Sequence, residues 1–206
     1  PEYRRQRQMC IRDRAKAALN EVNVAFNQIG SEGGIALRDA LKTSNVKFIT
    51  IGKMYTSVGG VVLTGSQVTT GVTLCARGRL GELIEGPDSD FDVKLKWADT
   101  GEESSYMKLH SLDGEPLKLP LQSPFEGDHL DLAHQQLDPG YVLLLSWWLG
   151  TEFSAAVNLL TIDSTGNMRK RKTYTLTAGE EKIDLSKKSL GSADVALVAA
   201  WLQRPE

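Results

Sequence analysis

Cysteine is scarce in this chain of 206 residues, with Cys10 and Cys75 as the only two. Two cysteines far apart provide neither a disulfide framework nor the ligand set of a structural zinc site. Hydrophobic residues make up 41% of the chain and charged residues 24%, as in ordinary globular proteins. A chain of this length buries roughly 70% of the surface that it exposes when unfolded, so we expect an apolar core to suffice for folding.

Long hydrophobic runs are also absent. The longest strongly apolar stretch, YVLLLSWWLG at residues 141–150, has about ten residues, whereas a membrane-spanning helix needs about 20. We therefore predict no membrane span. The chain contains no G-x-S-x-G nucleophile elbow, no G-x-x-x-x-G-K-[ST] phosphate loop and no H-E-x-x-H zinc motif. These absences favour a non-catalytic protein without a cofactor.

The opening stretch PEYRRQRQMCIRDR, residues 1–14, carries five arginines but has no aromatic interleaving beyond Tyr3. It lacks the apolar core of a signal peptide. Its segment RRQRQMCIRDR resembles the translated sequencing-adapter peptide that recurs at the ends of reading frames in assembled metagenomic data. We therefore interpret residues 1–14 as a non-native lead-in, with the native sequence beginning near Ala15 and its own N-terminus missing.

The rest of the chain is mildly acidic. Without residues 1–14 it has 19 basic and 24 acidic residues, a formal charge of −5. Such a balance disfavours a general phosphate-binding role, and we predict no nucleic-acid partner.

Residues 15–45 are predicted to be helical. In residues 15–29, apolar side chains recur at spacings of three, four and three, which places them on one helix face. A second short helix is expected at residues 31–42, with Ser31 as its cap. The apolar side chains of the first helix are Leu19, Val22, Phe26 and Ile29.

Residues 46–206 read as a series of short strands separated by turn signals every 8–14 residues. The segment FDVKLKW, residues 91–97, alternates apolar and polar side chains, as a half-buried strand does. Residues 106–112 and 117–121 are expected to form a hairpin, and so are the strands on either side of the turn DSTGN. The runs at 141–150 and at 193–201 (ADVALVAAW) are predicted to be core strands.

This pattern predicts a mainly β protein. The expected fold is an antiparallel, immunoglobulin-like β-sandwich over residues 46–206, preceded by the helical segment 15–45.

The chain's one histidine cluster is DHLDLAHQQLD. Histidine and carboxylate side chains ligate zinc and calcium, so we consider Asp128, His129, Asp131 and His134 as metal ligands of a metal-dependent hydrolase. The two histidines are five apart, which places them on one face of neither a helix nor a strand. The alternative is a polar loop whose leucines pack onto the core.

Adjacent tryptophans in the run at 141–150 would face opposite sides of a strand. An exposed Trp148, with Tyr141 in the same run, would then suit stacking on a sugar ring or anchoring of a protein partner. A strand covered on both faces is the alternative. The basic run MRKRK, residues 168–172, is interpreted mainly as protection of an edge strand, with contact to an anionic partner as the other possibility.

Two stretches, VTLCARGRLGEL at 72–83 and FDVKLKWADTGE at 91–102, resemble the "RG-x-L … W-x-D" arrangement of a group of uncharacterised bacterial β-rich proteins. The C-terminal runs up to residue 201 are similar to that group's closing strands. The resemblance implies an immunoglobulin-like sandwich and supplies no catalytic residues.

We therefore expect a non-catalytic structural or ligand-binding module, as in a bacterial or phage surface or appendage assembly, at the cell surface or in a virion. Its partners would be another protein or further copies of itself. The alternatives are a carbohydrate-binding module and the hydrolase described above.

Overall fold

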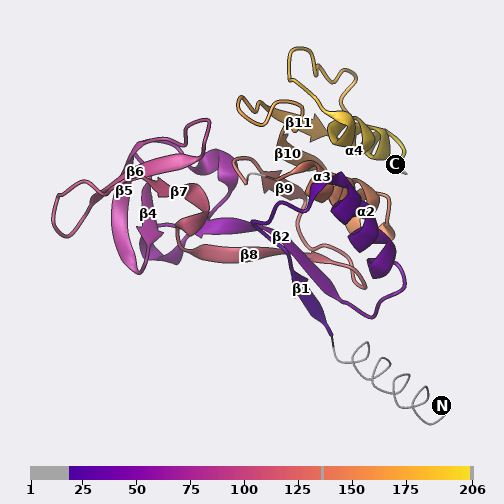
Figure 1. Ribbon diagram of the computed structural model, residues 1–206, viewed down its shortest axis with the longest axis horizontal. Coiled ribbons are helices and arrows are strands. Elements are labelled where there is room, and N and C mark those ends of the chain that lie inside the picture. The colour runs from indigo at the N-terminus through magenta and orange to yellow at the C-terminus, as the bar shows by residue number, and fades with distance from the viewer. Residues whose placement is uncertain (1–18, 136, 205–206) are drawn as a thin grey trace, which may run out of the picture.

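The computed structural model describes residues 19–135 and 137–204 and shows a mainly β protein, with 30% strand and 25% helix. The prediction of a mainly β fold is confirmed. The strands are β1 (Glu21–Asn23), β2 (Phe48–Thr56), β3 (Val62–Leu63), β4 (Thr73–Ala76), β5 (Arg79–Glu85), β6 (Asp92–Trp97), β7 (Met107–Lys108), β8 (Gly114–Pro120), β9 (His129–Leu132), β10 (Leu159–Asp163) and β11 (Thr173–Thr177). The helices are α2 (Gly30–Leu41), α3 (Pro139–Leu149) and α4 (Ser192–Leu202) (Figure 1).

The strands form three sheets. One has the order β1-β2-β3, with β8 also paired to β2; the second is β11-β10-β9, and the third is β4-β5-β6-β7. The third sheet is antiparallel throughout, whereas β1 pairs parallel with β2 and β9 pairs parallel with β10. An immunoglobulin-like sandwich consists of antiparallel sheets, so that finer prediction is not confirmed.

Two separate hydrophobic cores organise the chain. The large core lies between α2, α3, α4 and the sheets that contain β2 and β10, and the small core lies within the lobe formed by β4 to β7 (Figure 1). Strand β2 reaches both, because Ile49 and Ile51 are buried in the large core and Tyr55 is buried in the small one.

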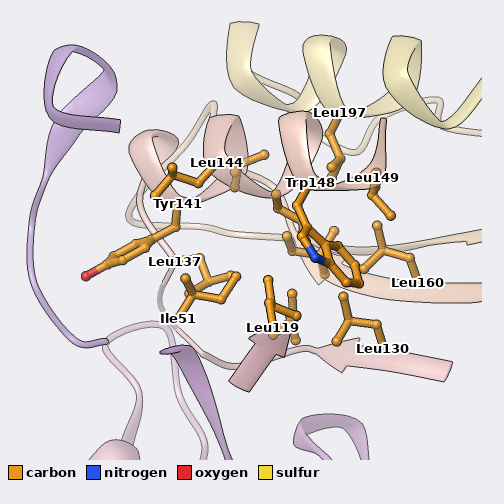
Figure 2. Close-up of a cluster of buried hydrophobic side chains, with 14 of the residues drawn as sticks. Ile51, Leu119, Leu130, Leu137, Tyr141, Leu144, Trp148, Leu149, Leu160 and Leu197 are labelled. Atoms are coloured by element: carbon orange, nitrogen blue, oxygen red, sulfur yellow. The ribbon is translucent and has the colours of Figure 1, made fainter. Parts of the chain in front are cut away.

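Residues 141–150 form most of α3, so the prediction of a core strand there is wrong. Asp138 starts the helix: its Oδ1 accepts hydrogen bonds from the backbone N–H groups of Gly140 (2.9 Å) and Tyr141 (3.2 Å), and Pro139 follows in the first turn. The helix is apolar on all sides because it packs between α2, α4 and the sheets. Figure 2 shows its side chains within the large core.

The prediction of a strand at residues 193–201 is wrong too, because the segment forms α4. Its alanines favour a helix, and Ala193, Leu197 and Trp201 recur every four residues on the buried face. Asp194 holds the first turn by accepting a hydrogen bond from the Gly191 N–H at 2.6 Å.

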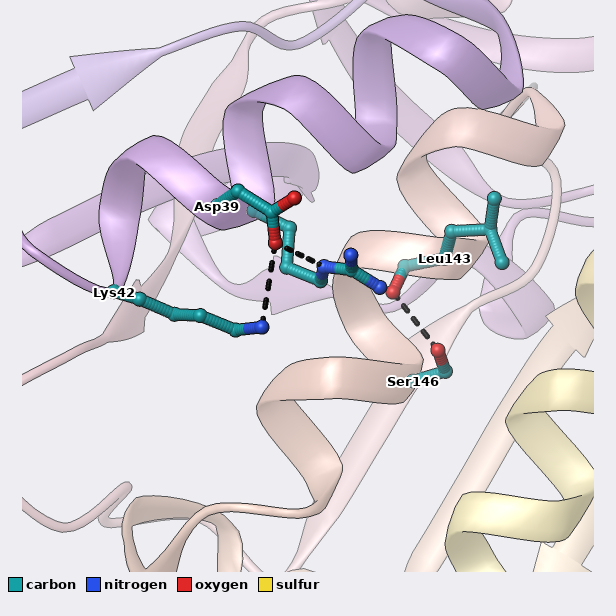
Figure 3. Close-up of polar contacts among 5 residues, drawn as sticks. Asp39, Lys42, Leu143 and Ser146 are labelled. Carbon is teal, nitrogen blue, oxygen red and sulfur yellow. Dashed lines mark hydrogen bonds and ion pairs between the residues drawn. The ribbon is translucent and has the colours of Figure 1, made fainter.

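The predicted helix at residues 15–29 is contradicted where the structure describes it, since residues 21–23 form β1. The chain is held there by backbone hydrogen bonds, from Lys47 N to the Asn20 carbonyl (2.8 Å) and from Val24 N to the Thr50 carbonyl (3.1 Å). The second predicted helix is confirmed as α2, but Ser31 is not its cap, because the helix already begins at Gly30 and the N-cap residue is Ile29. Figure 3 shows α2 beside α3, with the exposed Asp39 paired to Arg38 (2.9 Å) and Lys42 (3.3 Å).

The alternation in residues 91–97 correctly predicts β6, where Val93 and Leu95 are fully buried. The hairpin across the DSTGN turn is confirmed as the antiparallel pair β10–β11. The predicted hairpin of residues 106–121 is wrong, because β7 pairs with β6 whereas β8 pairs with β2. Residues 1–14, interpreted above as a non-native lead-in, lie outside the described residues, so that interpretation stays a prediction. Within the described residues, no helix is long and apolar enough to cross a membrane.

Candidate functional site

Two adjoining cavities lie where the large-core and small-core parts of the chain meet, and we call them together the inter-core cleft. The first has a volume of about 310 Å³ and the second about 430 Å³. Ser89, Phe91 and Arg171 line both cavities, so the two lie side by side. Cavities of this size accommodate small molecules.

Three residues that line the cleft have left-handed backbone conformations. The φ angles are 58° at Phe26, 60° at Phe91 and 60° at His134. Such a conformation costs about 1–3 kcal/mol at a non-glycine residue and persists only where the surroundings impose it. Hydrogen bonds from the backbone hold two of the three residues: His134 N donates to Asp163 Oδ2 at 2.6 Å, and Phe91 N donates to the Asp88 carbonyl at 3.0 Å.

The cleft walls carry two aromatic pairs. The ring of Phe91 lies 6.2 Å from that of His134 at an interplanar angle of 60°, and Phe26 stacks on His110 at 5.0 Å and 30°. Burial lowers the pKa of His110, with the nearby Lys53 adding to the effect, so this imidazole is neutral at pH 7. The walls therefore present flat, weakly polar surfaces.

Arg171 is the principal cation of the cleft. Its guanidinium lies 6.0 Å from the centre of the Phe91 ring, and it donates hydrogen bonds to the Leu137 carbonyl and to the Met168 sulfur. Burial lowers the pKa of Arg171, and nearby carboxylates oppose this effect, so the group stays ionised at neutral pH. No carboxylate of the described residues lies within 4.0 Å of it.

The buried carboxylates beside the cleft bind the protein's own backbone. Asp163 accepts hydrogen bonds from His134 N (2.6 Å) and from Thr173 Oγ1 (2.6 Å), one on each oxygen. Asp138 uses one oxygen to start α3 and the other to accept from Gly30 N at 2.8 Å. These acids hold the cleft in shape, and every one of their four oxygens accepts at least one hydrogen bond from the protein.

The four predicted metal ligands are not brought together. Asp131 is buried, where it accepts hydrogen bonds from the N–H and the hydroxyl of Ser66, while Asp128 is exposed and His134 lies in the cleft. The Nε2 atom of His129 is buried without a hydrogen-bond partner. In the part of the chain that the structure describes, no three His, Cys, Asp or Glu residues are grouped to hold a metal ion.

Trp148 and Tyr141 are each 1% exposed, so the prediction that they offer a ligand-binding surface is wrong. The indole Nε1 of Trp148 donates to the Pro120 carbonyl at 2.7 Å, and the Tyr141 hydroxyl bonds to the Val24 carbonyl. Figure 2 shows both rings among apolar side chains of the large core. The reason is the helix at 139–149, which turns both side chains inward.

The basic run at 168–172 does not form an edge strand, because β11 begins only at Thr173. The run belongs to the connection between β10 and β11, where Lys170 and Arg171 line the first cavity. The prediction that this run is itself a charged edge strand is therefore wrong, although the run directly precedes the edge strand β11, and contact with an anionic partner stays a prediction. Two parts of the sequence that were singled out thus reach the cleft: this basic run and the histidine cluster, through His134 and Asp138.

The comparisons with known proteins add no assignment. The chain matches no protein-family model, no curated protein sequence and no solved structure.

Proposed function

We propose that this protein is a non-catalytic ligand-binding module that takes a small molecule into the inter-core cleft. The observation that carries the proposal is Arg171, a half-buried cation that faces the cleft without a carboxylate partner among the described residues. The Leu137 carbonyl and more distant carboxylates offset only part of the cost of burying this cation, and a ligand that pairs with it would add charge-assisted hydrogen bonds.

The hydrogen bonds of the carboxylates beside the cleft favour a binding function over a catalytic one. A general base aims an oxygen at the substrate. Asp163 and Asp138 are buried, and both oxygens of each accept hydrogen bonds from the protein's own N–H and O–H groups. The carboxylates thus support the walls, and the remaining polar groups suit recognition.

The experiment is a fragment screen by thermal shift and ligand-observed NMR, repeated on a variant with a filled cleft. Ser89 is exposed and lines both cavities, so Ser89→Trp would occupy the space. Ser105→Trp is the matched control, since Ser105 is exposed and lies away from the cleft. We expect compounds that bind the unaltered protein and Ser105→Trp but not Ser89→Trp. The absence of any hit, or hits that survive Ser89→Trp, would overturn the proposal.

The two alternatives receive less support. A sugar platform built on Trp148 and Tyr141 would need both side chains to leave the large core. A hydrolase built on Asp128, His129, Asp131 and His134 would need these residues to converge, and Asp131 is already bonded to Ser66.

A second candidate function is association with a protein partner or with further copies of the chain, as in a surface or virion assembly. Residues 54–76 contain no charged side chain, and Val58, Val61 and Val62 within them are 53%, 57% and 43% exposed. Exposed apolar patches of this kind mark interaction surfaces. Light scattering after size-exclusion chromatography tests self-association: we expect concentration-dependent oligomers that Val61→Lys abolishes. A monomer at all concentrations would refute self-association.

A further inference from the structure

We infer that the ligand of the inter-core cleft is a small molecule with an anionic group on a flat ring, its anion in the first cavity and its ring in the second. This inference rests on the proposed function and specifies the class of ligand. It follows from which polar groups of the cleft are already bonded and which are not.

The donors of the first cavity are available. Lys170 is exposed, and its ammonium forms no hydrogen bond or ion pair within the described residues. Arg171 next to it uses donors only for the Leu137 carbonyl and the Met168 sulfur, and a guanidinium has five N–H groups. Two neighbouring cations with spare donors suit a carboxylate or a phosphate, which accept charge-assisted hydrogen bonds.

The acidic residues of the first cavity compete little with an anionic ligand for the hydrogen-bond donors of Lys170 and Arg171. The two oxygens of Asp163 accept from His134 N and Thr173 Oγ1. Asp88 Oδ1 accepts from the N–H groups of Asp90 (2.9 Å) and Asp92 (2.9 Å). Asp163 and Asp88 thus already accept hydrogen bonds, whereas Lys170 donates none from its side chain and Arg171 keeps N–H groups to spare, so the first cavity offers donors to a ligand.

The second cavity suits the ring. Phe26 and Phe91 line it, and the stack of Phe26 on His110 leaves Phe26 38% exposed. The cavity also carries Asp138 and Asp90, which disfavour an anionic group there. Only Arg171 reaches both cavities as a cation, and a guanidinium above the Phe91 ring can contact both parts of the ligand.

Four probes separate the contributions of the anion and the ring in isothermal titration calorimetry: phenyl phosphate, benzoate, benzyl alcohol and inorganic phosphate. We expect at least one of the two aromatic anions to bind about tenfold or more tightly than both benzyl alcohol and inorganic phosphate. Tighter binding of phenyl phosphate would indicate that the cleft recognises a phosphate, and tighter binding of benzoate would indicate a carboxylate. Added sodium chloride should weaken the binding of the aromatic anion.

Neighbouring residues provide matched variants. Lys170→Gln and Arg171→Gln should each weaken binding of the aromatic anion by about tenfold. Arg169→Gln removes the same charge from an exposed residue outside the cleft, so it should leave the affinity for the aromatic anion unchanged. Lys170→Gln keeps the test valid if Arg171→Gln fails to fold, because Lys170 forms no contact that the fold needs.

Two results would overturn the inference. One is an aromatic anion that binds no more tightly than benzyl alcohol, and the other is an equal loss in Arg169→Gln and Lys170→Gln. Neutral compounds blocked by Ser89→Trp would then still support the proposed function with a different class of ligand. If no compound of any charge binds in the cleft, both proposals fail together.

Discussion

The carboxylate of Asp138 accepts a hydrogen bond from the backbone N–H of Gly30, 108 residues earlier in the chain, at 2.8 Å. The other oxygen of Asp138 accepts from the first turn of α3. One buried side chain thus joins the first turns of α2 and α3 where they meet, next to the inter-core cleft.

Asp138→Asn should destabilise the protein by about 1–3 kcal/mol, because the amide nitrogen would face a backbone N–H and leave a buried donor unsatisfied. Urea unfolding followed by circular dichroism measures the change as a lower midpoint. Asp39→Asn, which removes the same charge from the exposed face of α2, should change the midpoint little. Equal effects of the two substitutions would show that the Asp138–Gly30 contact contributes nothing specific.

Two neighbouring glycines of α2 should respond in opposite directions to alanine. A Cβ atom on Gly34 would lie 2.4 Å from the Gly140 carbonyl oxygen, so Gly34→Ala must push α2 away from α3 at a cost of about 1–3 kcal/mol. A Cβ atom on Gly33 meets only Ile29 Cβ at 3.5 Å, so Gly33→Ala should stabilise the helix by about 0.5–1 kcal/mol. Thermal unfolding of both variants checks the sign of each change, and a stabilised Gly34→Ala would contradict the close helix approach.

Stability should fall at low pH partly through Asp113. The backbone N–H of Gly78, at 2.6 Å, is the main cause that lowers the pKa of this carboxyl, and the Cys75 thiol and the Arg77 N–H add to it. A carboxyl with a lowered pKa in the folded state stabilises the fold above its unfolded value, about 3.8, and loses that contribution as the pH falls through the folded value.

Asp113→Asn should therefore narrow the difference in urea midpoint between pH 7 and pH 2.5. Glu126→Gln is the control, because it removes the same charge from an exposed residue. A pH dependence that is the same in Asp113→Asn and in the unaltered protein would exclude Asp113 as a contributor.

The sequence predicts the fold where a local pattern has one interpretation. In residues 91–97 apolar and polar side chains alternate strictly, and β6 follows. Residues 141–150 are apolar except for Ser146, which fits a buried strand and a buried helix equally. The start signal Asp138–Pro139–Gly140 favours the helix. In residues 193–201, the apolar side chains fit both the two-residue repeat of a strand and the four-residue repeat of a helix face. The segment forms a helix because that places Leu197 and Trp201 in the core.

The candidate site is less accessible to sequence reasoning. Phe26, Phe91, His134 and Arg171 come from four distant segments, and only the pairing of strands brings them to one cleft. The positive φ angles of Phe26 and Phe91 have no signature in the residue type, because phenylalanine does not favour this conformation. The charge of residues 168–172 is visible in the sequence, but its interpretation depends on where β11 begins.

Trp148→Ala should cost about 3–5 kcal/mol of stability, because it empties the centre of the large core and leaves the Pro120 carbonyl without its donor. Trp147, on the adjacent and partly buried side of α3, is the matched control, and Trp147→Ala should cost clearly less. Urea midpoints compare the two variants. The packing of Phe125 edge-on to the Trp148 ring, with centroids 5.7 Å apart, adds to the expected loss. If Trp148→Ala were the milder of the two, the indole would have to be accessible to solvent, and a ligand-binding surface at Trp148 would again be a reasonable hypothesis.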